Sequence, residues 1–419
     1  MDLMERRKRA LGPVYELFYD NPVHLVRGKG VWLWDSEGRK YLDCYNNVAS
    51  VGHCHPDVVK ALADQAATLN TNTRYLHENV IELSEKISSK MPGDLSVCMF
   101  VCTGTEAKDL ATRIARAVTG NYGMIVSEYG YHGNSTLVYT LSTADSDERP
   151  DWLSVFDPPC LYRPAFDGDD PVEGYVGSVR DAIAGLKRNG HKPAAIMIDS
   201  IFDSQGTVVA PKGYFQEVYK TVHDAGGLVI ADEVQAGHCR TGDYWWGFEH
   251  DDVVPDIVTL GKPMGDGHPL AAVVTTPEIA AEIANRFSYF NTFGGNPVSA
   301  AVGKAVIDVI DVEGILENVT RTGAYTKKGL QALWDKYDVI GDVRGRGLFL
   351  SVELVRDRDS KTPDADAAHR MANIMKDEGV LISTHGRHGN VLKIRPPMVF
   401  SRENADRLLA AMDACLGRL

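Results

Sequence analysis

Apolar runs and amphipathic segments alternate through the middle of the chain. Short apolar runs predict buried strands, and apolar residues three and four positions apart predict helices. The predicted strands are residues 96–102, 124–127, 194–199, 228–231, 257–260 and 271–275. The predicted helices between them are residues 106–118, 179–187 and 214–225. This alternation predicts an α/β layer fold around a mostly parallel sheet.

The two ends of the chain have a different pattern. Residues 30–35 and 40–43 predict a short hairpin around a polar turn. A predicted helix over residues 297–311 leads into the C-terminal part, where strands are predicted at 347–354 and 391–395 and helices at 365–378 and 402–416. We therefore divide the chain into an N-terminal segment (1–50), a large domain (51–310) and a small α+β domain (311–419). The N-terminal segment is predicted to pack with the small domain.

Composition narrows the choice of partners. The 419 residues include 44 Lys and Arg against 57 Asp and Glu, a net charge of −13. This acidic balance argues against nucleic acid or an anionic membrane as the main partner, although a local basic pocket could still bind an anionic substrate. No apolar run is long enough to cross a bilayer, and the basic start at Arg6–Arg9 is not followed by the apolar stretch of a signal peptide.

Cysteine usage points to a reducing compartment. The seven cysteines are an odd number and contain no Cys-x-x-Cys pair, so we expect a cytoplasmic protein without a disulfide framework. His53, Cys54 and His55 are adjacent and lack a second ligand pair at metal-site spacing. We therefore interpret them as a turn before a helix that starts at Pro56, and we expect no metal.

An amine and a carboxylate follow two of the predicted strands. Lys262 comes directly after residues 257–260, and Asp232 ends the run 228–231. Ligands of such sheets bind outside the carboxyl ends of the strands, so both side chains are predicted to reach one rim. A lysine that holds an aldehyde as a Schiff base, with an aspartate that keeps a pyridinium nitrogen protonated, is the arrangement of a pyridoxal phosphate site.

Other segments beside strand ends could complete such a site. Gly104 and Thr105 open a helix and could cradle a phosphate, and Tyr131 between glycines could lie flat on a planar ring. Gln235 could reach the ring hydroxyl, and the segment 291–297 offers the Thr292 hydroxyl to an anion. Taken singly, each has an ordinary alternative: an N-cap, a turn with a surface tyrosine, a structural salt bridge of Asp232, a solvated lysine or a glycine-rich turn.

The order of these segments resembles the class III aminotransferases, which are fold-type I pyridoxal phosphate enzymes. The resemblance runs from Trp34-Asp35 to Pro396-Pro397. The matching segments are Gly52-His53-Cys54-His55-Pro56, Thr103-Gly104-Thr105-Glu106-Ala107, Tyr131-His132-Gly133, Asp232-Glu233-Val234-Gln235, Gly261-Lys262 and Thr292-Phe293-Gly294-Gly295-Asn296-Pro297.

The resemblance implies a role for each matching residue. Lys262 is the Schiff-base lysine, Asp232 holds the pyridinium nitrogen, and Tyr131, with His132 beside it, stacks on the ring. Gly104 and Thr105 take the cofactor phosphate, while Thr292 reaches the phosphate of the neighbouring subunit. Since family members work as dimers with shared sites, a homodimer is implied.

Within this family, three stretches look most like the ethanolamine-phosphate phospho-lyases: residues 43–53, 261–269 and 391–398. Those relatives convert O-phosphoethanolamine to acetaldehyde, ammonia and phosphate. In such a site the freed Lys262 would take a proton from the carbon next to nitrogen. Return of that proton to the cofactor gives transamination, whereas a phosphate on the neighbouring carbon is expelled instead.

The expected small phosphorylated amine needs a second phosphate site. The candidates are Arg395, Lys393, Asn47 and Tyr19. Lys393 stands where many relatives carry an arginine for a substrate carboxylate, and lysine can hold phosphate as a point charge. Lys393 and Arg395 could equally be a solvated strand edge.

Two positions depart from the family pattern. Lys108 stands where asparagine is usual, and Asp199-Ser200 replaces a glutamate-containing motif. Two alternatives to a phospho-lyase therefore stay open. One is an ω-aminotransferase that moves a terminal amine to a keto acid. The other is a non-catalytic member that uses the fold for binding, against which the intact Lys262 and Asp232 argue. A nicotinamide dehydrogenase is disfavoured because no Gly-x-Gly-x-x-Gly turn follows a strand.

Overall fold

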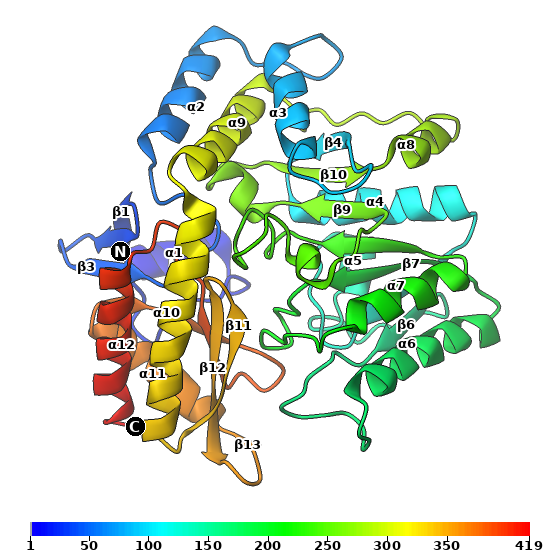
Figure 1. Ribbon diagram of the computed structural model, residues 1–419. Helices are drawn as coiled ribbons and strands as arrows, with labels where there is room; N and C mark the ends of the chain where they lie inside the picture. The colour runs from blue at the N-terminus through cyan, green and yellow to red at the C-terminus, as the bar shows by residue number, and fades with distance from the viewer. Residues whose placement is uncertain (1) are drawn as a thin grey trace.

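A central sheet forms the middle of the large domain in the computed structural model, which describes residues 2–419. The sheet has seven strands in the order β4-β10-β9-β8-β7-β5-β6, and only β10 runs antiparallel to its neighbours (Figure 1). The strands are β4 (Val97–Val101), β5 (Gly123–Ser127), β6 (Leu153–Phe156), β7 (Pro193–Asp199), β8 (Leu228–Asp232), β9 (Ile257–Leu260) and β10 (Ala271–Thr275). The predicted α/β fold with a mostly parallel sheet is confirmed.

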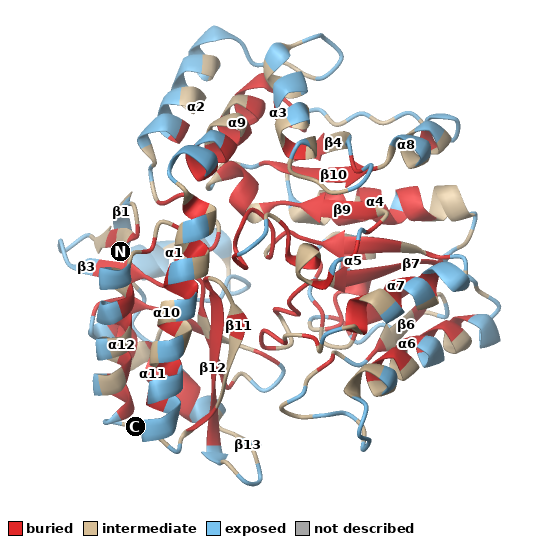
Figure 2. Ribbon diagram, in the orientation of Figure 1, coloured by how far each residue is buried: buried red, intermediate tan, exposed pale blue. Residues whose placement is uncertain are grey.

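Helices cover both faces of this sheet, so its strands are apolar on both sides. In β8, Val229 and Ala231 belong to one buried cluster and Ile230 to another, because successive side chains point to opposite faces. Figure 2 shows the strands buried and the outer faces of the helices exposed. The large-domain helices are α2 (Pro56–Thr68), α3 (Glu78–Ser88), α4 (Gly104–Thr119), α5 (Thr136–Leu141), α6 (Pro171–Arg188), α7 (Tyr214–Asp224), α8 (Pro277–Ala284) and α9 (Pro297–Val312).

Most predicted elements are confirmed to within one or two residues. The predicted strand over 257–260 matches β9, and the predicted helix over 402–416 matches α12 (Arg402–Leu416). The elements that were not predicted include α3, α5, α8, β6 and the long helix α10 (Ile315–Lys336). Helix α6 also begins earlier than predicted, because Asp170 caps the N–H groups of the first turn and Pro171 occupies its first position.

The carboxyl ends of three parallel strands bring the charged residues together. Asp199 at the end of β7 pairs in register with Asp232 at the end of β8, and Asp232 pairs with Thr259 of β9. Lys262 follows β9 in the short 3-10 helix η2 (Lys262–Gly265). This edge of the sheet is therefore the place where an amine and two carboxylates meet.

The N-terminal segment and the C-terminal part share a second sheet, in the order β1-β2-β3-β14. Its strands are β1 (Leu25–Lys29), β2 (Trp32–Asp35), β3 (Lys40–Asp43) and β14 (Val380–Leu381). The predicted hairpin is confirmed as the antiparallel pair of β2 and β3. β14 adds in parallel beside β3, so residues from opposite ends of the chain pair directly.

A third sheet lies in the C-terminal part, in the order β11-β12-β16-β15, with β13 paired to β12. Its strands are β11 (Ile340–Arg346), β12 (Phe349–Asp357), β13 (Thr362–Pro363), β15 (Ser383–His385) and β16 (Val391–Ile394). Helices α10 and α11 (Ala365–Asp377) pack on it, α12 packs against these two helices, and α1 (Leu3–Leu11) lies at the start of the chain (Figure 1). Among residues 2–419, no helix is both long and apolar enough to cross a membrane.

Leu42 ties the two ends of the chain together. It is fully buried in the core of the small domain, and its backbone N–H donates to the Gly379 carbonyl oxygen at 2.8 Å. We expect Leu42→Ala to lower the free energy of unfolding by about 3 kcal/mol, because the substitution leaves a cavity that neighbours fill only in part. Urea denaturation measures this change. The control Leu161→Ala, at a side chain that is 52% exposed, should change it by less than about 0.5 kcal/mol.

Candidate active site

Lys262 lies where strand β9 meets the start of helix α4. A Cβ atom at Gly261 would be 3.1 Å from the Val234 side chain and 3.5 Å from the Cα of Gly104, so the three segments are closely packed. Burial lowers the pKa of Lys262 to about 8, with the nearby cations Lys108 and Arg395 acting in the same direction. At neutral pH about a tenth of this amine is therefore unprotonated, far more than for an ordinary lysine.

Asp232 is buried and holds two nitrogen partners, the Lys108 ammonium and the His132 ring, on one oxygen. Its Oδ2 lies 2.7 Å from Nζ of Lys108 and 2.9 Å from Nδ1 of His132. Burial by itself would raise the pKa of Asp232, but Lys108 and His132 outweigh it and keep the pKa below its ordinary value. The neighbouring carboxyl of Asp199 has its pKa raised to about 7 by burial and by the charge of Asp232.

The first turn of α4 provides an anion site next to Lys262. Thr103 and Glu106 cap each other, and the Thr103 carbonyl oxygen accepts the N–H of Ala107. The first N–H groups of a helix have no intrahelical partner, so those of Gly104 and Thr105 can face a phosphate. Gly133 lies close to this turn, since a Cβ there would overlap the Thr105 hydroxyl.

These residues fit pyridoxal phosphate, which the sequence resemblance implies. Lys262 provides the amine, Asp232 the carboxylate for a ring nitrogen, and the start of α4 the phosphate cradle. Tyr131 is 41% exposed, which leaves its ring free to cover a flat ligand, and Nε2 of the buried His132 has no hydrogen-bond partner. When bound, this cofactor draws electrons away from the amine-bearing carbon of a substrate.

A second group of charges surrounds Asp203, which follows β7. Asp203 Oδ1 lies 3.0 Å from Nη1 of Arg395, and its Oδ2 lies 3.2 Å from Nζ of Lys393. Nδ1 of His385 is 3.5 Å from Oδ1. Burial raises the pKa of Asp203, but Arg395 and His385 more than compensate, so the pKa falls below its ordinary value. The two fixed cations exceed the single carboxylate, and the cluster has a net positive charge.

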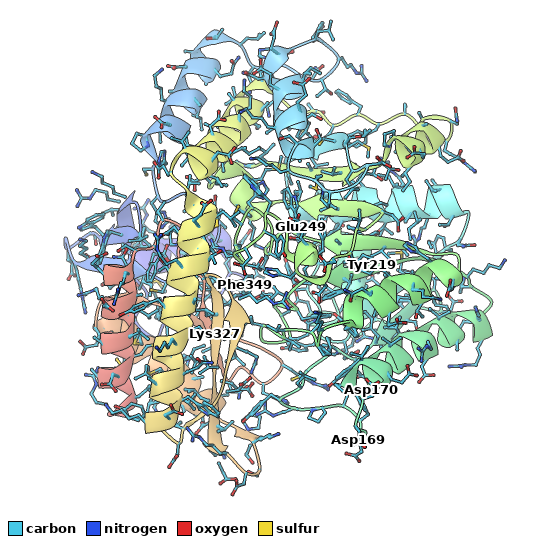
Figure 3. All side chains as sticks on the ribbon, viewed as in Figure 1. Asp169, Asp170, Tyr219, Glu249, Lys327 and Phe349 are labelled. Atoms are coloured by element: carbon cyan, nitrogen blue, oxygen red, sulfur yellow. The ribbon has the colours of Figure 1, made fainter. Side chains whose placement is uncertain are left out.

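The loop after β3 holds Arg395 in place. The Arg395 backbone N–H donates to the Cys44 carbonyl oxygen at 2.7 Å, and its guanidinium lies 4.9 Å from the ring centre of Phe349. Phe349 is labelled in Figure 3, where the small domain faces the large domain. Gln235 accepts from Arg395 and, at 2.9 Å, from Nδ2 of Asn47. Arg395 thus joins this loop to Gln235 of the large domain.

The structure brings together most of the residues predicted for the site, but not all of them. Lys393, Arg395, Asn47 and Gln235 form one hydrogen-bonded group with Asp203. Both ends of the Gln235 side chain are engaged in this group.

Two predicted residues lie outside this group. The first is Tyr19, whose hydroxyl donates to the Ile382 carbonyl oxygen at 2.7 Å. The aromatic ring beside the two cations is instead that of Tyr45, which was not predicted and lies 5.9 Å from both Lys393 and Arg395. Thr292 is exposed, and the side chain of its neighbour Asn291 lies 3.3 Å from Glu106 of the same chain.

Sequence reasoning did not anticipate the partners of Lys108 and Asp203. Lys108 carried a signal, because it shares the apolar face of α4 with Ala111 and Ala115 at helical spacing. A lysine on such a face needs a buried anion. Asp203 carried no comparable signal, since its cations come from residues about 190 positions later.

Comparison with known proteins gives consistent matches along the chain. The model of the family described as aminotransferase class-III matches residues 16–416. An alanine–glyoxylate aminotransferase 2-like protein of Drosophila melanogaster is 43% identical over 99% of this chain and 87% of its own. The ethanolamine-phosphate phospho-lyase homolog 1 of Caenorhabditis elegans is 37% identical over 99% of this chain and 93% of its own. A phospholyase from Arthrobacter, solved in complex with phosphoethanolamine, superposes with a TM-score of 0.96 at 41% identity and full coverage of both chains.

The lowered pKa of Lys262 predicts how the protein stripped of cofactor takes up pyridoxal phosphate. Only the neutral amine can attack the aldehyde, so the uptake rate should rise about tenfold per pH unit below pH 8 and level off above it. Visible absorbance in a stopped-flow experiment measures this rate. Lys262→Ala should give no covalent absorbance, whereas Lys60→Ala, at an exposed lysine, should match the unmodified protein. A rate that is flat between about pH 6 and 9 would contradict the assignment.

Proposed function

The chain belongs to the class-III aminotransferase family, and we propose that it is a pyridoxal phosphate-dependent phospho-lyase acting on O-phosphoethanolamine. The products are acetaldehyde, ammonia and phosphate. The observation that carries the proposal is the net positive cluster of Lys393 and Arg395, close enough to Lys262 for Arg395 to lower its pKa. The phosphoethanolamine with which the Arthrobacter phospholyase was solved is a ligand of matching charge.

The residues of the chain divide the work of elimination. Lys262 takes the proton from the carbon that bears the amine, and its low pKa suits a base that works near neutral pH. Lys393 and Arg395 bind the substrate phosphate and orient its carbon–oxygen bond. That bond breaks, and phosphate leaves with the bonding electrons. Water then hydrolyses the remaining two-carbon amine, so that acetaldehyde carries the oxygen of water and ammonia is released.

The anion site suits phosphate chiefly through Lys393. Arg395 is buried, and Nη1 of its guanidinium is engaged by Asp203 and Gln235. Lys393 is only partly buried and presents a point charge, which binds phosphate well. This reasoning favours the lyase over an ω-aminotransferase, the activity class that the Drosophila relative's name suggests.

We also propose a homodimer in which the partner completes each site. Large apolar side chains are exposed beside the segment that contains Thr292: Tyr75 at 69%, Leu76 at 98%, Phe290 at 42% and Phe293 at 69%. Exposed apolar groups of this size usually mark a contact surface. With this surface covered, Thr292 would be placed to reach the cofactor phosphate of the partner.

The decisive test is phosphate release without any amine acceptor. Protein loaded with cofactor and given O-phosphoethanolamine, but no keto acid, should release equal amounts of acetaldehyde and phosphate. Lys262→Ala should lower the rate by at least about 10³-fold, because it loses both the amine and the base. Coupled enzymatic assays measure both products. Turnover that requires a keto acid and releases no phosphate would identify an aminotransferase instead. A colourless protein that develops no visible absorbance with pyridoxal phosphate would indicate the non-catalytic alternative.

Lys393 should contribute to substrate binding more than to chemistry. We expect Lys393→Gln to raise KM for O-phosphoethanolamine about tenfold, since a charge-assisted hydrogen bond contributes about 1.5–3 kcal/mol, and to change kcat much less. The control Lys336→Gln, at an exposed lysine paired with Asp413, should leave both constants unchanged. An unchanged KM for Lys393→Gln, even when combined with Arg395→Lys, would place the phosphate elsewhere.

A further inference from the structure

Lys108 is a buried cation that the reaction outlined above does not use. Its side chain is 5% exposed, and it projects from α4 onto the end of β8, where its Nζ meets Oδ2 of Asp232 at 2.7 Å. Burying a lysine is costly unless it is paired, and pairing it here places an extra positive charge at the carboxylate that faces the cofactor ring.

The geometry leaves Asp232 with one shared and one free oxygen. Oδ2 is occupied by Lys108 and His132, whereas Oδ1 has only a long contact, 3.3 Å from the backbone N of Val234. Oδ1 is therefore the atom available to a ring nitrogen. A carboxylate already paired with an ammonium group attracts a further proton less strongly, so it holds the ring nitrogen protonated less firmly than a lone aspartate would.

We propose that Lys108 is a positioning residue that partly neutralises Asp232 and thereby favours loss of phosphate over transfer of the amine. The second half of this statement rests on the proposed function. A less firmly protonated ring is a weaker electron acceptor. Amine transfer requires the ring to hold the electron pair until the proton is delivered to a different carbon. In elimination the electron pair departs at once with phosphate, so a weaker acceptor suffices.

The same cation acts on Lys262. The charged and titratable groups around Lys262 and Asp232 are Lys108 from α4, His132 after β5, Asp199 and Asp203 at and after β7, and Arg395 after β16. Lys108 and Arg395 repel a proton on Lys262, while Asp203 and Asp232 attract one. Removing the charge of Lys108 therefore favours protonation at two places: the amine of Lys262 and the ring nitrogen that Asp232 would bind.

The test compares Lys108→Met, which keeps the length of the side chain without its charge, with Lys108→Arg, which keeps the charge. In Lys108→Met, the pH midpoint for cofactor uptake should rise by roughly half a unit to one unit. The ¹⁵N NMR shift of ring-labelled pyridoxal phosphate should move toward the protonated form. With pyruvate present, amine-transfer turnovers per phosphate released should increase about tenfold. Lys108→Arg should stay near the unmodified protein in all three measurements.

The controls separate charge from structure. Lys376→Met removes another buried lysine, on α11, and should change none of the three measurements. If Lys108→Met does not fold, Lys108→Gln replaces it with the same expected shifts, because the proposal depends on charge and not on the hydrogen bond.

Two outcomes would overturn the proposal. One is an uptake midpoint and a ring-nitrogen shift that match the unmodified protein after the charge is removed. The other is a changed ring-nitrogen shift with no change in the ratio of the two reactions. If the unmodified protein releases no phosphate at all, the proposed function fails, but the uptake and NMR measurements still test the effect of Lys108 on Asp232.

Discussion

Two ionised carboxylates buried at the carboxyl edge of the central sheet, Asp232 and Asp203, are matched by cations, and this pairing organises the active site. The strands there are covered on both faces by apolar clusters, so a charge at their ends lies in a poorly solvated environment. Asp232 meets Lys108 and His132, and Asp203 meets Arg395 and Lys393. Breaking either pair would leave a buried charge uncompensated, which costs about 3–5 kcal/mol.

Lys262 is placed between these two groups of charges. Lys108 and Arg395 oppose a proton on its amine, and Asp203 and Asp232 favour one, while burial decides the direction of the shift. The result is a lysine with a pKa of about 8, which can act both as the attachment point of an aldehyde and as a base near neutral pH. The chemistry of the lysine is thus controlled by residues that do not touch the reacting atoms.

The small domain contributes to the same site through Arg395. This residue directly follows the C-terminal strand β16. Its backbone N–H donates to Cys44, and its side chain pairs with Asp203 of the large domain. The β3–β14 pairing fixes the N-terminal loop against the C-terminal part, so that Asn47 and Arg395 reach Gln235 together. The anion site therefore depends on contacts among three distant parts of the chain.

The sequence by itself determined the local features. Hydrophobic periodicity and local residue chemistry predict the parallel strands and the cap of α4. They also place Asp232 and Lys262 at the ends of strands. Family resemblance added the roles of these residues and the cofactor. The hydrophobic pattern did not predict α10 or β6, and it predicted a start for α6 that was too far along the chain.

Only the tertiary structure decided which charges meet. Asp203 binds cations about 190 positions away, and Lys108 lies beside a carboxylate 124 positions later because α4 packs onto β8. Pairing of buried charges depends on distance in space, which one strand or one helix does not encode. For the same reason the contacts of Gln235 with Asn47 and Arg395 could not be read from the sequence. The sequence thus placed Lys262 and Asp232 just past strand ends, and the packing of distant segments set the charges around them.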